Sequence, residues 1–328
     1  MKHGVTAKDV AELAGVSQSS VSRVFFKGAK VSEKTRAKIQ AAAEQLGYRP
    51  NEFARSLITN RTKIIGIVMK GVHNPFYPQV LEQFAAAFKE KGYSILFVHT
   101  NNDEIKAEDV ETLLNYNVAG VIITDAAMAL NVGEEFKKNK IPVVFFNRKL
   151  TTAEFYSVCC NNLDAGRRVA EYFIRKGVAE MAYIAGDADT STSRERQKGF
   201  QEVLEQEKIA YRPFFSDYTY NGGYETAMQI IEGGNTPAAF FVANDIMALG
   251  VLDALKKKSV KVPEETKVIG FDNIEMASWP AYQLTTWEQP IDKMIEATVA
   301  YLLDEIAGYT GFVETVEVDG CLIERATT

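Results

Sequence analysis

The chain has 328 residues, of which 46% are hydrophobic, and its formal net charge at pH 7 is −6. This length suits two or three domains with full cores, and no apolar run approaches the roughly 20 residues of a membrane helix. Its three cysteines, two of them adjacent, form neither a disulfide framework nor a CxxC metal-binding pattern.

The charge is divided unevenly along the chain. Residues 1–63 contain twelve Lys and Arg against five Asp and Glu, a net charge of +7, whereas the remainder carries −13. A basic head on an acidic body predicts that only the head meets a polyanion. Because charge alone would also fit an ordinary solvated surface, the interpretation depends on a motif in the same segment.

The first predicted helix lies within residues 6–15. Thr6 is a suitable N-cap, and the apolar side chains of Val10, Leu13 and Ala14 are expected on the inner face. Gly15 occupies the position at which a left-handed residue commonly ends a helix.

Two more short helices follow. Ser17 is expected to cap the second, with Val21 and Val24 directed inward. The outward residues of this helix are Gln18, Ser19, Ser22 and Arg23. Ser32 opens a third helix that Gly47 ends, and its apolar positions are Ile39, Ala42, Ala43 and Leu46. Three short helices with a glycine turn between the first two predict a helix-turn-helix.

The polar side chains of the second helix suit DNA recognition. A helix fits the major groove, where Gln pairs with adenine and Arg with guanine or a phosphate. An ordinary helical hairpin is the alternative for the helix-glycine-helix pattern, but the small polar residues and the local positive charge favour DNA.

The segment PNEFARSLITNRT (50–62) predicts a short helix capped by Asn51. About two turns are too few to be stable alone in water, so we expect it to order against DNA and a second subunit. Leu57, beside Arg55, suits an apolar wedge between base steps in the minor groove. The alternative is a linker whose leucine packs on the neighbouring domain.

The segments VAELAGVSQSSVSRV, VSEKTRAKIQAAAEQLGYRPN and ARSL resemble the headpiece and hinge of the lactose repressor family. The resemblance implies a pseudo-palindromic operator, base contacts from Gln18, Ser19 and Arg23, and Leu57 as the hinge wedge. It implies domains at 1–50 (headpiece), 51–62 (hinge) and 63–328 (effector-binding and dimerisation core). The predicted DNA-binding residues are Thr6, Ser17, Gln18, Ser19, Ser22, Arg23, Asn51, Arg55 and Leu57.

From residue 64 onward, short apolar runs alternate with helical stretches. The runs are KIIGIVM, YSILFVH, VAGVIIT, IPVVFFN, YSVCC, EMAYIAG, AAFFVAN and TKVIGFD. This alternation predicts doubly wound parallel sheets with helices on both faces. The runs are too many for one small sheet, so two similar α/β lobes are expected.

Polar residues follow most of these runs, for example Asn74, Asn147 and Asp272. Ligands in such folds bind beyond the carboxyl ends of the strands, so two facing lobes would bring these residues to one crevice. A single Asn or Asp after a strand is more often a turn residue or a helix cap, so the repetition carries the inference. Their chemistry suits hydroxyl groups, and Phe76 and Tyr218 are better candidates for covering a sugar or base face than the two tryptophans.

The family resemblance extends through the body. TSTSRERQKGF (190–200), FVANDIMALG (241–250) and VIGFDN (268–273) resemble the effector-binding segments of the distal lobe. The predicted effector-binding residues are Asn74, Phe76, Asn147, Arg148, Arg196, Tyr218, Asn244 and Asp272. Two departures leave the ligand open, because Asn147-Arg148 stands where sugar-binding members often have Asp-Arg, and Asn161-Asn162 where Asp-Asn is common.

The resemblance also implies a two-lobed core like that of periplasmic binding proteins, in which the chain crosses between lobes near 158–161 and 286–290 and once more near its C-terminus. Lobe 1 would comprise about 63–158 and 290–318, and lobe 2 about 159–289 and 319–328. Because no apolar heptad tail follows ERATT, a homodimer rather than a tetramer is expected.

No catalytic motif supports an enzyme. Residues 66–71 mimic the start of a phosphate-binding loop, but Val72 and His73 stand where Lys and Ser or Thr are required. We therefore expect no catalytic residues, metal site or cofactor. An exported sugar-binding protein would need a secretory signal, which the N-terminus lacks, and we expect a cytoplasmic protein that does not bind membranes.

The combined interpretation is a repressor of a carbohydrate-utilisation operon, controlled allosterically by a sugar or sugar phosphate between the lobes. Control by a purine corepressor or by a phosphocarrier protein stays open. So does whether the ligand releases or promotes DNA binding.

Overall fold

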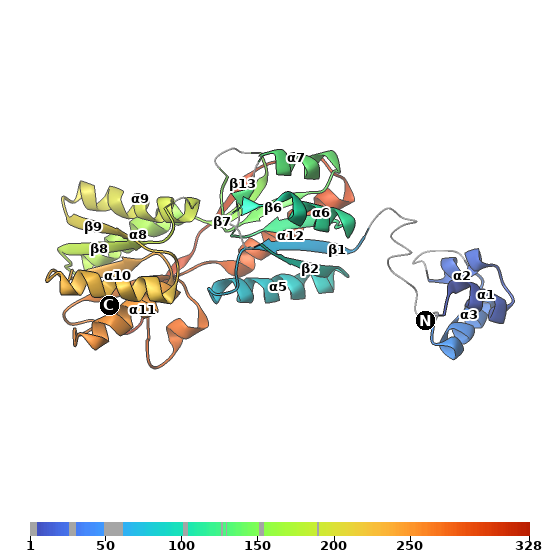
Figure 1. Cartoon of the computed structure of the whole chain (residues 1–328), viewed down its shortest axis with the longest axis horizontal. Helices are drawn as coiled ribbons and strands as arrows, with labels where there is room; N and C mark the ends of the chain where they lie inside the picture. The colour runs from blue at the N-terminus through green and yellow to red at the C-terminus, as the bar shows by residue number, and fades with distance from the viewer. Residues whose placement is uncertain are drawn as a thin grey trace. The chain divides into compact units, whose positions relative to one another are not determined.

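The computed structural model of the chain describes residues 5–25, 31–48, 62–100, 104–125, 127–128, 130–150, 154–188 and 190–328. The residues form two compact units, which divide between Thr62 and Lys63. Figure 1 follows the chain from the N-terminus in blue to the C-terminus in red. Among the described residues, no helix is both long and apolar enough to cross a membrane.

The described residues of the N-terminal unit form three helices. They are α1 (Ala7–Ala14), α2 (Gln18–Val24) and α3 (Glu33–Leu46). The predicted caps Thr6, Ser17 and Ser32 each accept a hydrogen bond from a backbone N–H in the first turn. Gly15 and Gly47 are in the left-handed conformation, with φ of 65° and 63°. The helix-turn-helix prediction is therefore confirmed.

The small core of this unit lies between the three helices. Its buried residues are Val10, Ala11, Val21, Val24, Ile39, Ala42 and Ala43. The prediction that Leu13 points inward is wrong, since its side chain is 46% exposed. At about 100° per residue, Ala7, Val10, Ala11 and Ala14 share one face of α1, and Leu13 lies about 110° from the centre of that face.

The C-terminal unit contains two six-stranded sheets. The strands of the first are β1 (Ile64–Met69), β2 (Ser94–His99), β4 (Gly120–Ile123), β6 (Val143–Phe146), β7 (Tyr156–Cys160) and β13 (Thr315–Val318). The strands of the second are β8 (Glu180–Ala185), β9 (Ala210–Phe215), β10 (Ala239–Val242), β11 (Lys267–Asp272), β12 (Thr285–Glu288) and β14 (Cys321–Ile323). A two-stranded sheet joins β3 (Glu104–Ile105) to β5 (Ala127–Met128).

Each large sheet defines one lobe of this unit. The order is β13-β7-β6-β4-β1-β2 in lobe 1 and β14-β12-β11-β10-β8-β9 in lobe 2, and all neighbours are parallel except β12 and β14. All eight predicted apolar runs form strands, and the predicted α/β class is confirmed. β9 was not predicted, because Pro213 interrupts its pattern. A proline is tolerated there since β9 is an edge strand.

Helices cover both faces of each sheet (Figure 1). In lobe 1 they are α5 (Phe76–Glu90), α6 (Ala107–Asn115), α7 (Leu130–Lys138) and α12 (Ile291–Ala307). In lobe 2 they are α8 (Asn162–Arg175), α9 (Ser191–Gln206), α10 (Tyr220–Glu232) and α11 (Asp245–Lys257), with the short 3-10 helix η1 (Glu275–Ser278).

Alternation along the strands divides the core of lobe 1 between its two faces. Ile65 and Ile67 of β1 belong to the cluster that contains the phenylalanines of α5, whereas Val68 belongs to the cluster under α6 and α7. Successive side chains of a strand point to opposite faces, so a run such as IIGIVM can be apolar throughout.

The chain crosses between the lobes three times, after β7, after β12 and between β13 and β14. The implied boundary at 158 falls inside β7, so the first crossing follows Cys160. Two of the crossing segments are tied together, since the Asn161 amide donates to Asp319 Oδ1 at 3.1 Å.

Candidate functional site

The exposed side of α2 carries the predicted base-contacting residues. Gln18, Ser19 and Arg23 are exposed, and Ser22 is half-buried. Val21 and Val24 of the same helix are buried in the hydrophobic core of the N-terminal unit, the head. The helix therefore presents a polar face while its apolar side fixes it on α1 and α3, and the Arg36 guanidinium donates to Val24 O at 3.2 Å.

The N-terminus of α2 is organised by hydroxyl groups. Ser17 Oγ lies 2.9 Å from both Ser19 Oγ and Ser20 Oγ. A cap of this kind satisfies backbone N–H groups of the first turn and orients the helix start. Of the predicted DNA-binding residues, Ser17 and Ser19 thus already share a hydrogen-bond network.

Thr6 forms a reciprocal capping box with Asp9. Thr6 N and Thr6 Oγ1 both donate to Asp9 Oδ2 at 2.8 Å, and Asp9 N donates back to Thr6 Oγ1 at 3.4 Å. These hydrogen bonds, the backbone one foremost, lower the pKa of Asp9 below its usual value. Asn51, Arg55 and Leu57 lie outside the described residues, so the hinge helix and wedge stay predictions.

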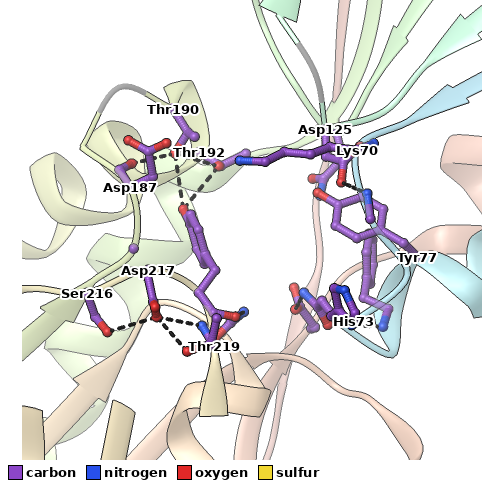
Figure 2. A pocket seen from close by; sticks show the side chains of 18 of the residues that line it. Lys70, His73, Tyr77, Asp125, Asp187, Thr190, Thr192, Ser216, Asp217 and Thr219 are labelled. Atoms are coloured by element: carbon purple, nitrogen blue, oxygen red, sulfur yellow. Dashed lines mark hydrogen bonds between the residues drawn. The ribbon is translucent and has the colours of Figure 1, made fainter. Parts of the chain in front are cut away.

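A cleft of about 630 Å³ lies between the two lobes of the C-terminal unit (Figure 2). All eight predicted effector-binding residues line it. Lobe 1 contributes Asn74, Phe76, Asn147 and Arg148, and lobe 2 contributes Arg196, Tyr218, Asn244 and Asp272. The polar strand ends therefore converge as expected, whereas Trp279 and Trp287 do not line the cleft.

Arg196 is a buried cation on α9, only 3% exposed. Its Nε donates to Asn162 Oδ1 at 2.8 Å and its Nη1 to Ala243 O at 2.5 Å, and its guanidinium lies 3.4 Å from the centre of the Phe271 ring. Close approach of α8 to α9 sets this position, because a Cβ at Gly166 would collide with Arg196 O. The guanidinium is thus held in place before any ligand binds.

Asp272 and Asn74 connect the two walls of the cleft. Asn74 Nδ2 of lobe 1 donates to Asp272 Oδ2 of lobe 2 at 3.4 Å, and Gln289 Nε2 donates to Asp272 Oδ1 at 2.7 Å. Burial raises the pKa of Asp272 to about 6, against the lowering effects of Arg196 and the two hydrogen bonds. Near neutral pH the carboxylate is still ionised and accepts hydrogen bonds.

Asp245, the first residue of α11, is a second buried carboxyl group close to Asp272. It accepts from Thr286 Oγ1 at 2.5 Å and from Ile274 N at 2.9 Å. Burial, followed by the charge of Asp272, raises its pKa to about 7. Asp245 was not among the predicted effector contacts, and its carboxyl group holds the segment after β11 in place.

Tyr218 lies over the loop that follows β8. A Cβ at Gly186 would collide with the Tyr218 ring, so glycine is required for this approach. Tyr218 Oη is 3.1 Å from Thr190 Oγ1, and Asn244 Nδ2 donates to Tyr218 O at 3.4 Å. Asn244 also caps α11 by accepting from Met247 N at 3.1 Å, so its amide serves the fold and the cleft together.

The loop after β6 carries the adjacent pair Asn147 and Arg148. Asn147 is 5% exposed and adopts a positive φ of 60°, which Asn tolerates better than most residues. Its Oδ1 has no hydrogen-bond partner among the described residues. Arg148 is half-buried at the cleft surface.

The next residue, Lys149, links the lobes beside the cleft. Its backbone N–H donates to Ser191 Oγ at 3.0 Å, and its ammonium group contacts Glu195 at 2.8 Å and also Glu317. Ser191 and Glu195 lie on α9 of lobe 2, and Glu317 lies on β13 of lobe 1. Burial opposes the charge of Lys149, but the hydrogen bonds to both carboxylates outweigh burial and raise its pKa.

Further lining residues were not among the predicted contacts. They include Lys70, His73, Tyr77, Asp125, Asp187, Thr190, Thr192 and Asp217. In Figure 2, Lys70, His73 and Tyr77 lie on one wall, and Asp187, Thr190 and Asp217 on the other. Asp125 and Asp187 follow predicted strands, so the strand-end rule could have found them. Asp217 follows the unpredicted β9, which left no such signal.

Asp125 has a structural role in the loop after β1. It accepts from Lys70 N at 2.5 Å, from Gly71 N at 3.2 Å and from Thr124 Oγ1 at 3.0 Å. Among the described residues, no group of three His, Cys, Asp or Glu side chains is arranged to hold a metal ion.

Comparisons with known proteins cover both units. The family "Bacterial regulatory proteins, lacI family" matches residues 6–51, and the "Periplasmic binding protein-like domain" matches residues 170–328. The ribose operon repressor of Escherichia coli K12 is 32% identical over 327 residues, which cover 98% of this chain and 99% of that protein. The HTH-type transcriptional repressor PurR of Yersinia enterocolitica is 32% identical over 329 residues, covering 98% and 96%.

Among solved structures, the lac repressor dimer bound to operator and the anti-inducer ONPF is similar, with a TM-score of 0.89 and 27% sequence identity over 99% of both chains. The similarity therefore extends from the three-helix head through both lobes.

Proposed function

Because this chain belongs to the lacI family of bacterial regulatory proteins, we propose that it represses a carbohydrate-utilisation operon under the control of a sugar-like effector bound in the cleft. One observation carries the proposal. A head with an exposed polar recognition helix and a cleft lined by strand ends of two lobes occur in the same chain.

The head would bind DNA through two kinds of contact. Basic residues would neutralise phosphates and release counterions, which makes binding strongly salt-dependent. Gln18, Ser19 and Arg23, exposed at α2, would contact base edges and determine the sequence. A homodimer would place two such helices on a pseudo-palindromic operator, because half-site symmetry mirrors the two-fold axis of the protein.

The cleft would bind the effector between two polar walls. Arg196, Asn244 and Asp272 on lobe 2 face Asn74, Asn147 and Arg148 on lobe 1. Such groups suit the hydroxyls of a sugar. Tyr218 is partly exposed and offers an aromatic surface, whereas Phe76, predicted for the same role, is only 1% exposed and packs in the core of lobe 1. A ligand that touches both lobes favours one interlobe arrangement, and it shifts DNA binding by its difference in affinity for the two arrangements.

The required coupling is modest. A tenfold change in operator affinity corresponds to about 1.4 kcal/mol, within the typical allosteric range of about 1–3 kcal/mol. Absence of enzymatic activity, a dimeric state and a cytoplasmic location accompany the proposal as predictions.

The proposal is tested by sequencing the genomic fragments that the purified full-length chain retains, then measuring its affinity for the recovered site against a shuffled duplex of equal composition. We expect the recovered site to bind at least a hundredfold more tightly near physiological salt. Sugars added to the complex should change this affinity. Equal affinity for the shuffled duplex at every salt concentration would reject the DNA-reading function.

A further inference from the structure

We propose that the effector is an anionic sugar derivative whose carboxylate or phosphate binds Arg148 while a neighbouring hydroxyl donates to Asn147 Oδ1. This inference rests on the proposed function, because it specifies the ligand class of the same cleft. It would also orient the ligand, with the anion on the lobe 1 wall and the remaining hydroxyls toward lobe 2.

The first observation concerns the guanidinium of Arg148. It lines the cleft and is half-buried, yet it takes part in no hydrogen bond or ion pair with the residues that the structure describes. A guanidinium carries five N–H donors in a planar fork that matches a carboxylate or a phosphate. Partial burial removes water from such a group, so an anionic ligand group gains more there than at an open surface.

Several other charged groups of the cleft already have protein partners. Arg196 donates to Asn162 Oδ1 and Ala243 O. Asp125 accepts from two backbone N–H groups, and Asp217 accepts from the backbone and hydroxyl of Thr219 at 3.0 and 2.7 Å. Part of the hydrogen-bonding capacity of these groups is therefore already used within the protein, whereas the Arg148 guanidinium forms no hydrogen bond or ion pair with the described residues.

The second observation is independent and concerns Asn147. Its amide is 95% buried at the cleft, and its Oδ1 has no partner among the described residues, although a buried acceptor costs free energy when it stays unpaired. A hydroxyl or N–H donor of the ligand would satisfy it. Because an amide carries no charge, Asn147 does not neutralise Arg148, as a carboxylate at the same position would.

Asn147 and Arg148 are adjacent in the chain, and together they favour a ligand that carries two neighbouring groups of different kinds. Arg148 favours a negative charge, and Asn147 favours a hydroxyl beside it. Sugar acids and sugar phosphates contain this pair, whereas neutral sugars lack the charge. The carboxylate of Asp272 on lobe 2 accepts hydrogen bonds, so it suits the hydroxyl end of the ligand.

The test measures binding of matched ligands to the full-length chain by calorimetry at low and high salt. The sets are glucose with gluconate, glucuronate and glucose 6-phosphate, and ribose with ribonate and ribose 5-phosphate. We expect at least one anion to bind tenfold or more tightly than its neutral parent, and the acid and phosphate arms identify which anion is used. Tighter binding of the neutral parents, or no binding of any acid or phosphate, would overturn the inference.

Variants then assign the effect to the two residues. Arg148→Gln should weaken binding of the anion by about tenfold to hundredfold and should weaken binding of the neutral parent much less. In Asn147→Asp, the new carboxylate has nearly the same shape as the amide and should pair with Arg148. The affinity for the anion should therefore fall, and the affinity for the neutral sugar should stay the same or rise. Arg175→Gln is the matched control, because it removes a cation from an α8 side chain that is 67% exposed.

Unchanged preference for the anion in both cleft variants would reject the assignment to Arg148 and Asn147. If a neutral sugar binds tightly and alters operator affinity, the proposed function would stand, but the inference of an anionic effector would be rejected. Loss of specific DNA binding in the unmodified chain would instead contradict the proposed function.

Discussion

The head and the two-lobed core place their candidate functional residues in opposite environments. In the head, Gln18, Ser19 and Arg23 are exposed on a helix whose other side packs into the hydrophobic core of that unit. In the core, Arg196, Asn244 and Asp272 are themselves buried and hydrogen-bonded. Recognition and stability are therefore separable in the head, whereas in the cleft one side chain often serves both.

The largest expected effect is unfolding of the N-terminal head while the two-lobed C-terminal unit stays folded. Ile39→Ala removes a fully buried side chain from the small cluster of the head, and such substitutions cost about 2–5 kcal/mol. We expect loss of operator binding and an early unfolding transition, while the main calorimetric transition of the core stays in place. Glu12→Ala, on the exposed side of α1, is the control. An equal shift of both transitions would contradict the division at Thr62.

Substitution of Arg196 should show the double role of a cleft residue. Arg196→Ala removes a buried guanidinium that binds Asn162 and Ala243, so effector affinity should fall about a hundredfold and the core should lose stability. Operator binding without effector should persist. Lys198→Ala on the same helix, with a 67% exposed side chain, should change neither property. Unchanged affinity for the true effector would mean that the ligand binds elsewhere.

Gln18→Ala tests whether the head separates recognition from stability. We expect a loss of about 1–3 kcal/mol in specific binding, with unchanged non-specific affinity, salt dependence and melting temperature. Gln40→Ala, exposed on α3, provides the comparison. A uniform loss on all duplexes would indicate a phosphate contact instead of a base contact.

The raised pKa of Asp272 predicts opposite pH dependences for ligand binding and stability. Protonation removes a hydrogen-bond acceptor, so effector affinity should fall roughly tenfold as the pH drops from 7 to 5, below the pKa of about 6. Between about pH 4 and 6 the folded core holds a proton that the unfolded chain releases, so this group's contribution to stability is lost as the pH rises. Asp272→Asn should flatten the pH dependence of effector binding and remove this group's part of the stability curve, to which Asp245 with its raised pKa of about 7 also contributes. An unaltered pH profile would contradict the assignment.

The smallest effect concerns the interlobe contact of Lys149. Lys149→Met leaves Glu195 and Glu317 without their shared cation, at a cost of about 1 kcal/mol because the group is partly exposed. The expected result is weaker effector binding together with a slightly lower melting temperature. Lys138→Met, whose side chain is 76% exposed beside Glu135, should have no effect. Tighter binding would show that the contact opposes lobe closure.

Much of the molecule follows from local patterns. Thr6, Ser17, Ser32 and Gly15 are local signals, because a cap acts within one helical turn, and they correctly bounded the helices. The apolar runs likewise predicted eight strands. Local patterns were less informative for Leu13, whose orientation depends on which face of α1 the neighbouring helices cover.

The sequence by itself determined the helical head, the alternation of strands and helices, and the polar residues that follow the strands. Only the tertiary structure decided that Asn74 meets Asp272, 198 residues away. It also decided that, among the residues described, Asn147 Oδ1 has no hydrogen-bond partner and Arg148 forms no hydrogen bond or ion pair in the same cleft. The physical reason is range. Capping and periodicity act within a few residues, whereas the partners of a buried polar atom depend on how distant segments pack.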